Sequence, residues 1–291
     1  MEPDRTAEPK SLFGRLQSLD RRILYAVFFL FVVAAHFVPV RWPSEPAKHT
    51  RQLFEKVEEV PSDKVVILDS DWFAGIRAES EGQLRAVVSH LMRRKLKFLF
   101  LSWANNPDGQ KYGYDIVSDV AKDNNYQYGR DWVALGGIAR ASGAELASLA
   151  KDIRGFVKTD IYGTDLKDVQ KLPMMQKVRD IYDVGLVVLF SYGADGTSWI
   201  GFIQGVYGTP LGVAVSAISS STAYAFVESG QICGMLAGAP GAAEYEQLLG
   251  LEDEKRFARK PVNVLSMSIA YILFAMLLGN VSYFISLWKK P

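Results

Sequence analysis

The sequence has very few of the side chains from which metal centres and disulfide frameworks are built. Its 291 residues include one cysteine, Cys233, and three histidines, at positions 36, 49 and 90. A single cysteine excludes an internal disulfide. No histidine follows a predicted strand, which disfavours zinc sites and serine–histidine–aspartate hydrolysis. Cys233 lies in an apolar run, where we expect its thiol to pack as a small hydrophobic side chain.

The chain also lacks an excess of charge of either sign. Lysine and arginine number 33 and aspartate and glutamate 32, so the formal net charge is +1. A nucleic-acid-binding protein usually has a basic excess or a basic face, because its interface is dominated by phosphates. We therefore predict no nucleic-acid partner.

Two nucleotide-binding signatures are missing as well. A dinucleotide-binding domain would carry Gly-x-Gly-x-x-Gly after its first strand, whereas the first predicted strand is followed by Asp69-Ser70-Asp71-Trp72. The Gly-Lys-Ser/Thr sequence of a phosphate-binding P-loop does not occur. We predict neither a cofactor nor a bound metal ion.

The chain does have two long apolar runs, one near each end. Residues 23–40 and 264–288 carry no formal charge, and at about 1.5 Å per residue each covers most of a bilayer's hydrocarbon core. Arg21-Arg22 and Arg41-Trp42 bracket the first run, and Trp288-Lys289-Lys290 closes the second. Cationic and aromatic side chains thus mark the interfaces, and we predict two transmembrane helices. A cleaved signal peptide is the alternative for the first run.

These runs define the organisation of the chain. We predict an N-terminal tail at 1–22, a transmembrane helix at 23–41, a stalk at 42–62, an α/β domain at 63–252, a basic juxtamembrane segment at 253–262, a second transmembrane helix at 263–288 and a C-terminal tail at 289–291.

The orientation in the membrane rests on the first helix. Lysine and arginine are nearly balanced between the terminal side and the domain side of the two runs, but Arg21-Arg22 abuts the first. Positive charge favours the cytoplasm. We therefore expect an integral protein of the cell's inner membrane, with both termini cytoplasmic and the domain outside the cytoplasm. The bilayer is one predicted partner, and other membrane proteins or further copies of the chain are the others.

Between the runs, short apolar segments alternate with segments of helical periodicity. The predicted strand and helix pairs are 65–68 with 79–95, 98–101 with 112–123, 132–135 with 142–153, 185–190 with 197–207, 211–215 with 220–229, and 232–236 with 242–249. Residues 48–59 should form the helix of the stalk, and 155–183 a loop with a short helix starting near Pro173. This alternation predicts a mostly parallel, Rossmann-like α/β sheet with helices on both faces.

In such a sheet, ligands bind beyond the carboxyl ends of the strands. The residues that we predict to line such a site are Asp69, Ser70, Asp71, Ser102, Asn105, Ser191, Tyr192, Gly193, Asp195, Ser216, Ser219, Ser220 and Gly238. The alternative is that they form ordinary turns and helix caps, with Thr197, Ser219 or Ser220 as N-caps. The pattern leaves both readings open.

One pair of motifs resembles an enzyme family. Leu68-Asp69-Ser70-Asp71, followed by Phe100-Leu101-Ser102, resembles the first two motifs of haloacid-dehalogenase-type phosphatases. The resemblance implies Asp69 as nucleophile and Asp71 as general acid/base beside magnesium. The chain departs from the pattern because no threonine follows Asp71 two positions on, and Asp195 supplies at most one distant carboxylate. Without a third ligand, Asp69 and Asp71 form a turn and not a magnesium site.

A second resemblance covers most of the chain. The segments 159–163 (Thr-Asp-Ile-Tyr-Gly), 207–211 (Tyr-Gly-Thr-Pro-Leu), 229–232 (Ser-Gly-Gln-Ile) and 237–245 (Ala-Gly-Ala-Pro-Gly-Ala-Ala-Glu-Tyr) lie between the two apolar runs. This frame is similar to an uncharacterised bacterial and archaeal family of membrane proteins with two spans. The resemblance implies a topology and no activity.

Three functions fit these observations. The first is a non-catalytic scaffold or partner-binding subunit of a membrane assembly, which could also bind a small ligand at the strand ends. The second is a metal-dependent phosphohydrolase that uses Asp69 and Asp71. The third is a tethered solute-binding domain.

We also expect His90, with Arg93 and Arg94, on a solvated helix face, and Glu244 at the positive end of a helix dipole.

Overall fold

The computed structural model of the protein describes residues 20–37, 45–103, 106–136, 142–156, 159–164, 166–193, 196–252 and 256–288. Contacts divide the chain into two units, Pro43–Arg259 and the two ends, Met1–Trp42 with Lys260–Pro291. The predicted tails fall mostly outside the described residues, as do the end of the first predicted span, Asn105 and Asp195.

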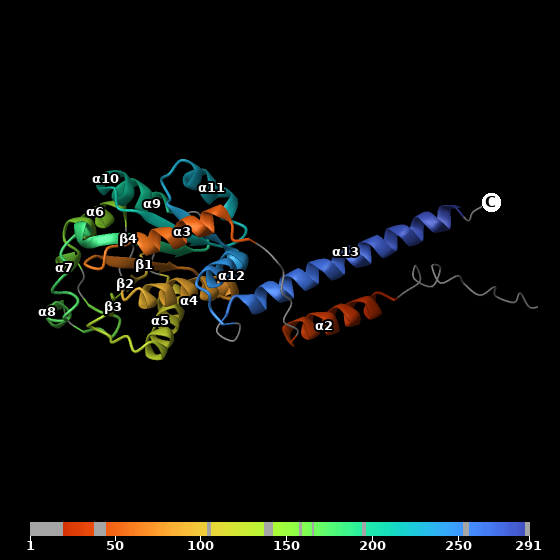
Figure 1. Cartoon of the computed structure of the whole chain (residues 1–291), viewed down its shortest axis with the longest axis horizontal. Coiled ribbons are helices and arrows are strands. Elements are labelled where there is room, and N and C mark those ends of the chain that lie inside the picture. Colours follow the sequence, from red (N-terminus) through yellow and green to blue (C-terminus); the bar gives the residue numbers. More distant parts are fainter. Residues whose placement is uncertain are drawn as a thin grey trace, which may run out of the picture. The chain divides into compact units, whose positions relative to one another are not determined.

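The central unit is built on a parallel sheet of six strands (Figure 1). The strands are β1 (Val65–Asp71), β2 (Lys97–Leu101), β3 (Trp132–Ala134), β4 (Val184–Ser191), β5 (Leu211–Val215) and β6 (Gly234–Ala237). Their order is β3-β2-β1-β4-β5-β6. This is the order of the doubly wound Rossmann fold, in which the direction of winding changes between β1 and β4. The predicted fold class is confirmed at this level.

The two faces of the sheet bury separate apolar clusters, since side chains alternate along a strand. Val66 and Leu68 of β1 join one cluster, and Val65 and Ile67 join the other. The helices of the first face are α3 (Lys48–Glu59), α4 (Arg77–Arg93), α5 (Pro107–Asp123) and α12 (Gly238–Leu248). The second face is covered by α6 (Gly143–Lys151), α7 (Ile153–Phe156), α8 (Leu166–Val169), α9 (Thr197–Trp199), α10 (Gly205–Tyr207) and α11 (Ser220–Glu228). Figure 1 shows the sheet enclosed between these sets.

Several segments differ from the sequence-based expectation. β1 extends through Asp71, so the Asp-Ser-Asp motif is strand and not loop. Residues 197–207 form α9, a π-helical turn at Ile200–Gln204 and α10 in place of one α-helix. Residues 173–177 form turns instead of a helix, and two 3₁₀ turns occur at Ala74–Ile76 and Ile181–Asp183.

The expected stalk helix forms, but it belongs to the domain. Leu53 and Val57 of α3 are fully buried against the sheet, because two glycines allow the helix to approach it closely. A Cβ atom on Gly234 would lie 2.2 Å from the backbone nitrogen of Leu53, and one on Gly212 would lie 2.4 Å from its Cδ1. The apolar side of α3 is therefore part of the core.

His90 also differs from the prediction, because it is fully buried and not on a solvated face. Its Nδ1 lies 2.8 Å from the hydroxyl of Tyr245, its Nε2 lies 2.7 Å from Glu58 Oε1, and its ring stacks on Phe54. Burial is the largest cause of a lowered pKa of His90. The neutral imidazole ring of His90 thus joins α3, α4 and α12. Its Nε2 donates to Glu58, and its Nδ1 accepts from the hydroxyl of Tyr245.

Helix α12 holds the two chain segments that lead toward the ends of the protein. Glu244 accepts hydrogen bonds from the backbone N–H of Ala47 at 3.0 Å and from the hydroxyl of Thr50 at 2.7 Å, at the start of α3. Glu246, which is buried, accepts from the N–H groups of Phe257 and Ala258 at 2.9 and 3.0 Å. Glu244 thus binds the start of α3; the expected place at the positive end of its own helix dipole is wrong, because Glu244 lies beyond the first turn of α12.

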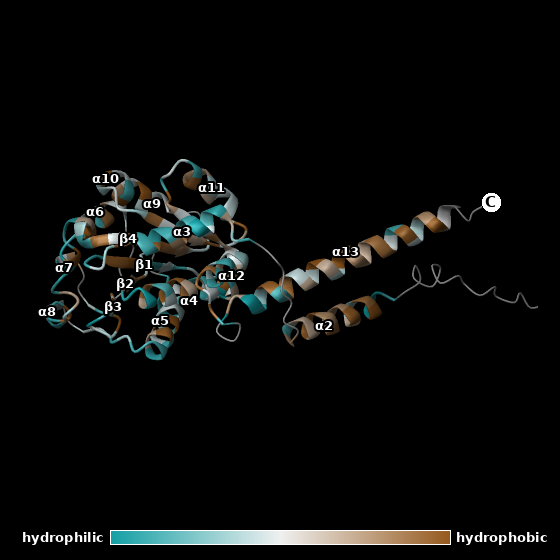
Figure 2. Ribbon diagram, in the orientation of Figure 1, coloured by the Kyte–Doolittle hydropathy of each residue, from teal (hydrophilic) through white to brown (hydrophobic). Residues whose placement is uncertain are grey.

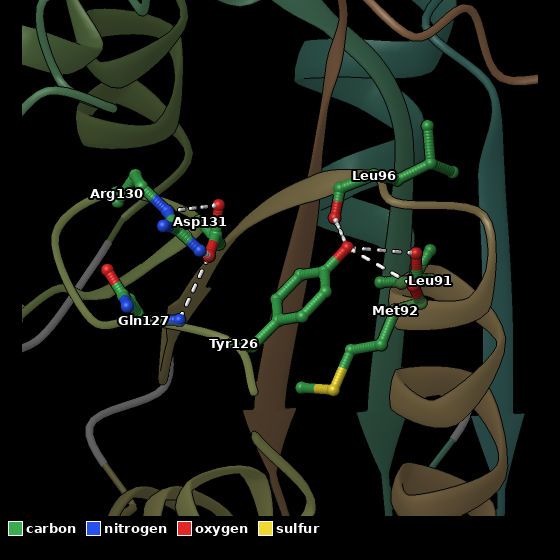
Figure 3. Close-up of polar contacts among 7 residues, drawn as sticks. All are labelled: Leu91, Met92, Leu96, Tyr126, Gln127, Arg130 and Asp131. Atoms are coloured by element: carbon green, nitrogen blue, oxygen red, sulfur yellow. Dashed lines mark hydrogen bonds and ion pairs between the residues drawn. The ribbon is translucent and has the colours of Figure 1, made fainter. Parts of the chain in front are cut away.

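At the amino edge of the sheet, Tyr126 joins α4 to β2 (Figure 3). Its hydroxyl points at three carbonyl oxygens, those of Leu96, Met92 and Leu91, at 3.3, 3.4 and 3.5 Å. Burial raises the pKa of Tyr126 to about 12, so the hydroxyl keeps the proton that it donates. The neighbouring loop is closed by Asp131, which binds Arg130 and the N–H of Gln127. Together these contacts fix the end of α4.

The second unit consists of two apolar helices, α2 (Arg21–Phe37) and α13 (Arg259–Trp288). Among the described residues, one helix is long and apolar enough to cross a membrane, the stretch Arg259–Ile285 of α13. Figure 2 shows hydrophobic residues along both helices. The hydroxyl of Tyr271 donates to the carbonyl of Leu24 at 2.9 Å, and the rings of Phe28 and Phe31 lie beside it. The helices therefore pack together, while the first span stays a prediction.

The close approach of α3 predicts that Gly234→Ala will destabilise the protein. The added methyl group collides with the backbone of Leu53, so α3 must shift off the sheet, at a typical cost of about 1–3 kcal/mol for overpacking. Denaturant unfolding followed by tryptophan fluorescence measures this. Gly201→Ala is the control, because a Cβ atom there meets nothing within 4 Å. Equal stability of both variants would contradict the assigned packing of α3.

Candidate functional site

The candidate site lies at the carboxyl ends of β1 and β4, where the sheet changes its direction of winding. Asp69, Ser70 and Asp71 are the last residues of β1, and Asp71 is paired in register with Ser191 of β4. The alternation of side chains sends Asp69 and Ser70 to opposite faces. The structure therefore directs Ser70 away from Asp69, whereas Asp69 and Asp71, two residues apart, project to the same face and influence each other's charge.

Asp69 is enclosed by two tryptophan-bearing segments. It is 1 % exposed. Its Oδ1 accepts a hydrogen bond from the backbone N–H of Trp103 at 2.7 Å, and its Oδ2 accepts from the indole Nε1 of Trp199 at 2.8 Å. The two indole rings lie 6.1 Å apart in an edge-to-face arrangement. Asp69 thus joins the end of β1 to the loop after β2 and to α9, which follows β4.

The environment of Asp69 has opposing effects on its ionisation. Burial disfavours the carboxylate, and this raises the pKa of Asp69 to about 7. Asp71 raises the pKa further, whereas the donors of Trp103 and Trp199 lower it. The group therefore titrates close to neutral pH. A perturbed pKa in this range is common at functional sites, but it also occurs in structural networks.

The serines of the neighbouring strand ends are used in local hydrogen bonds. Ser70 donates to the carbonyl of Gly109 at 2.8 Å, Ser102 accepts from the N–H of Asn106 at 3.3 Å, and Ser191 accepts from the N–H of Gly193 at 3.2 Å. The first two bonds fasten the strand ends to the start of α5. These are turn contacts of the kind that the alternative reading expects. Its N-caps do not form, because Gly196 and not Thr197 precedes α9, and Ser219 makes no capping hydrogen bond in α11.

The loop after β5 is held in the same way. Ser216 and Ser219 both donate to the carbonyl of Tyr192, at 2.8 and 2.6 Å, so this loop is tied to the one after β4. Ser220 donates to the carbonyl of Ala217. Gly238 starts α12 with a φ of +58°, a conformation that favours glycine. Hydroxyl groups predicted to face a ligand therefore bind the backbone.

Two residues that the sequence-based reasoning missed complete this framework. Gln83 is fully buried in α4 and donates from Nε2 to the carbonyls of Val215, Leu236 and Gly238 at 2.9, 3.3 and 3.1 Å. Glu79 accepts from the N–H of Ala217 at 2.8 Å. No sequence pattern marks these residues, because they resemble the solvated positions of any helix and their partners lie more than 130 residues away in the sequence.

Three large side chains with apolar surface are exposed at this edge; Tyr192 was among the predicted site residues, whereas Phe73 and Ile218 were not. Phe73 follows β1 and is 41 % exposed, Tyr192 follows β4 and is 43 % exposed, and Ile218 follows β5 and is 91 % exposed. The rings of Phe73 and Tyr192 lie 4.9 Å apart. Ser219, next to Ile218, binds the carbonyl of Tyr192. We call these three side chains the apolar rim. Large apolar residues within loops were the sequence signal that could have revealed it.

The part of the chain that the structure describes contains no group of three or more His, Cys, Asp or Glu side chains placed to hold a metal ion. Asn105 and Asp195, two of the predicted site residues, lie outside that part. Burial raises the pKa of the Cys233 thiol to about 12, which disfavours the reactive thiolate form. No known protein family and no curated protein matches this chain.

The raised pKa of Asp69 predicts a pH-dependent stability. Its folded-state pKa of about 7 exceeds the ordinary value of 3.8. Between these values the folded state holds a proton that the unfolded state has released, so the free energy of unfolding falls as the pH rises from about 4 to about 7. Asp69 alone should account for a fall on the order of 4 kcal/mol in the free energy of unfolding over this pH range. Unfolding by denaturant at several pH values measures it.

Asp69→Asn should flatten this dependence, whereas Asp115→Asn, at an exposed position of α5, should leave it unchanged. Part of the slope should remain in Asp69→Asn, because burial also raises the pKa of Glu246 to about 7. An unaltered slope in Asp69→Asn would mean that Asp69 is ionised throughout this range.

Proposed function

We propose that this chain is a membrane-anchored, non-catalytic subunit whose α/β domain binds a partner protein. The apolar rim of Phe73, Tyr192 and Ile218 is the observation that carries this proposal. Exposed aromatic and branched apolar side chains are enriched where proteins bind one another. The rim lies at the edge of the sheet where α/β domains bind their ligands, and the loops beneath it are fixed by internal hydrogen bonds.

The geometry of Asp69 disfavours the phosphohydrolase alternative. A nucleophilic carboxylate must reach the substrate, and a magnesium ligand must turn an oxygen toward the ion. Asp69 is buried, and each of its oxygens already accepts a strong hydrogen bond from a tryptophan N–H group. The solute-binding alternative gains no support either, since the described domain has a single sheet and such proteins usually close a cleft between two lobes.

Anchoring by two helices completes the proposal. The apolar stretch of α13 supplies one span. α2 supplies the second, which its exposed apolar residues and its packing against Tyr271 support. The resemblance to a family with two spans favours the same topology. With Glu244 and Glu246 fastening the segments on either side of the domain, the chain leaves the domain at two fixed points, which suits a scaffold.

We further propose that both termini are cytoplasmic and that the domain is outside the cytoplasm. The substitution Lys122→Cys, at an exposed position and in a Cys233→Ala background, should then be labelled by a membrane-impermeant thiol reagent on intact cells. Labelling only after lysis would place the domain in the cytoplasm. The Cys233→Ala protein alone is the control for background labelling.

The partner-binding proposal predicts a site-specific cross-link. A photoreactive benzoylphenylalanine at position 218 should form an adduct with a second polypeptide in native membranes, while the same group at position 122, near the opposite edge of the sheet, should form none. Phe73→Ser combined with Tyr192→Ser should lower the yield at position 218 severalfold, because it removes the aromatic surface on which the partner packs.

Equal adduct yields at positions 218 and 122, or no adduct at either, would contradict partner binding at the rim. A second result would favour the enzyme instead. In that result, Mg²⁺ raises the melting temperature of the wild type but not that of Asp69→Asn. A ligand that binds the folded state stabilises it, so this would indicate that Asp69 binds the ion.

A further inference from the structure

A hollow lies away from the apolar rim, toward the other edge of the sheet. It has a volume of about 590 Å³ and is formed by the second half of α4, the end of α5, the end of α12 and the segment that leads to α13. Ligand-binding pockets commonly have volumes of about 300–1,000 Å³. The hollow is therefore large enough for the polar part of a small amphiphile.

Charges of both signs line this hollow. Arg93 of α4 and Asp123 of α5 are the informative pair, because neither has an ion-pair partner among the described residues. Arg93 donates one N–H to the carbonyl of Leu249 at 2.6 Å and keeps further donors. Arg85, the other arginine, is already paired with Glu81 and lies over the ring of Phe257. One cationic and one anionic group are thus free to bind a ligand.

Part of the remaining wall is apolar and adjoins α13 in the sequence, while Ser89, Asn124 and Glu246 add polar groups. Val120, Leu249, Leu251 and Phe257 supply the apolar surface. Phe257 is two residues before the start of α13, and two residues span at most about 7 Å. Glu246 holds Phe257 and Ala258 in place through their N–H groups. If α13 crosses the bilayer, this wall lies within reach of its headgroups.

We propose that this hollow binds the headgroup of a zwitterionic aminophospholipid, with the phosphate on Arg93 and the primary ammonium on Asp123. Arginine offers several N–H donors to a phosphate, and a carboxylate accepts hydrogen bonds from an ammonium group. The apolar wall then packs against the glycerol and the upper acyl chains. This site is distinct from the apolar rim and goes beyond the partner binding proposed there.

The test measures melting temperature and lipid affinity of the full chain in detergent, with short-chain phosphatidylethanolamine as the probe. We expect a concentration-dependent rise in melting temperature. Arg93→Gln and Asp123→Asn should each weaken binding about tenfold or more, since each removes a charge-assisted hydrogen bond. Arg94→Gln and Lys122→Gln are the matched controls and should bind as the wild type does. Arg94 pairs with Glu58, outside the hollow.

The choice of lipid distinguishes the components of the headgroup. Phosphatidylglycerol lacks the ammonium, the ammonium of phosphatidylcholine has no N–H, and inorganic phosphate has neither ammonium nor glycerol, so all three should bind about tenfold more weakly or worse. Equal affinity for phosphatidylglycerol or phosphate would overturn the zwitterionic assignment. Unchanged affinity in both variants would overturn the site. Should Arg93→Gln fail to fold, Asp123→Asn, at an exposed position, still decides the outcome.

Discussion

The carboxyl edge of the sheet depends on one buried carboxyl group. Asp69 receives the backbone N–H of Trp103 from one side and the indole N–H of Trp199 from the other, so a single side chain joins the loops that follow β1, β2 and β4. A carboxyl group in such a place is costly to bury, and its hydrogen bonds offset only part of that cost. What Asp69 provides in return is position. Its hydrogen bonds fix the loops at the point where the direction of winding in the sheet changes.

The other polar groups at this edge serve the same purpose. Ser216 and Ser219 bind the loop after β4, Gln83 spans the ends of β5 and β6, and Ser70 fastens β1 to α5. Because the donors of these groups are used in internal hydrogen bonds, the loops that carry Phe73, Tyr192 and Ile218 are held in place. A surface held in this way loses little conformational entropy on binding, as the proposed partner binding requires.

Much of the fold was predictable, because the central strands are apolar runs of the kind buried in parallel sheets. The bounds of β5 at Leu211–Val215 agree with the prediction. Elements that depend on distant contacts were not predictable. The Asp-Ser-Asp end of β1 has the composition of a loop and becomes strand because β4 pairs with all three residues and β2 with Asp69. His90 is buried because Glu58 and Tyr245, which lie far from it in the sequence, meet it in the core. The sequence nominated the carboxyl edge of the sheet and Tyr192 within it, whereas the tryptophan partners of Asp69 and the exposure of Phe73 and Ile218 were not foreseen.

The two glutamates of α12 have a mechanical consequence. Residues two apart on a helix face opposite sides, so Glu244 and Glu246 hold the two chain segments on opposite flanks of one helix. A pull on either segment is borne first by a side chain of α12, and tension between the two ends of the protein passes through that helix. Since α12 also packs against α3 and α4, a load that enters at Glu244 or Glu246 is shared with the other helices of this face.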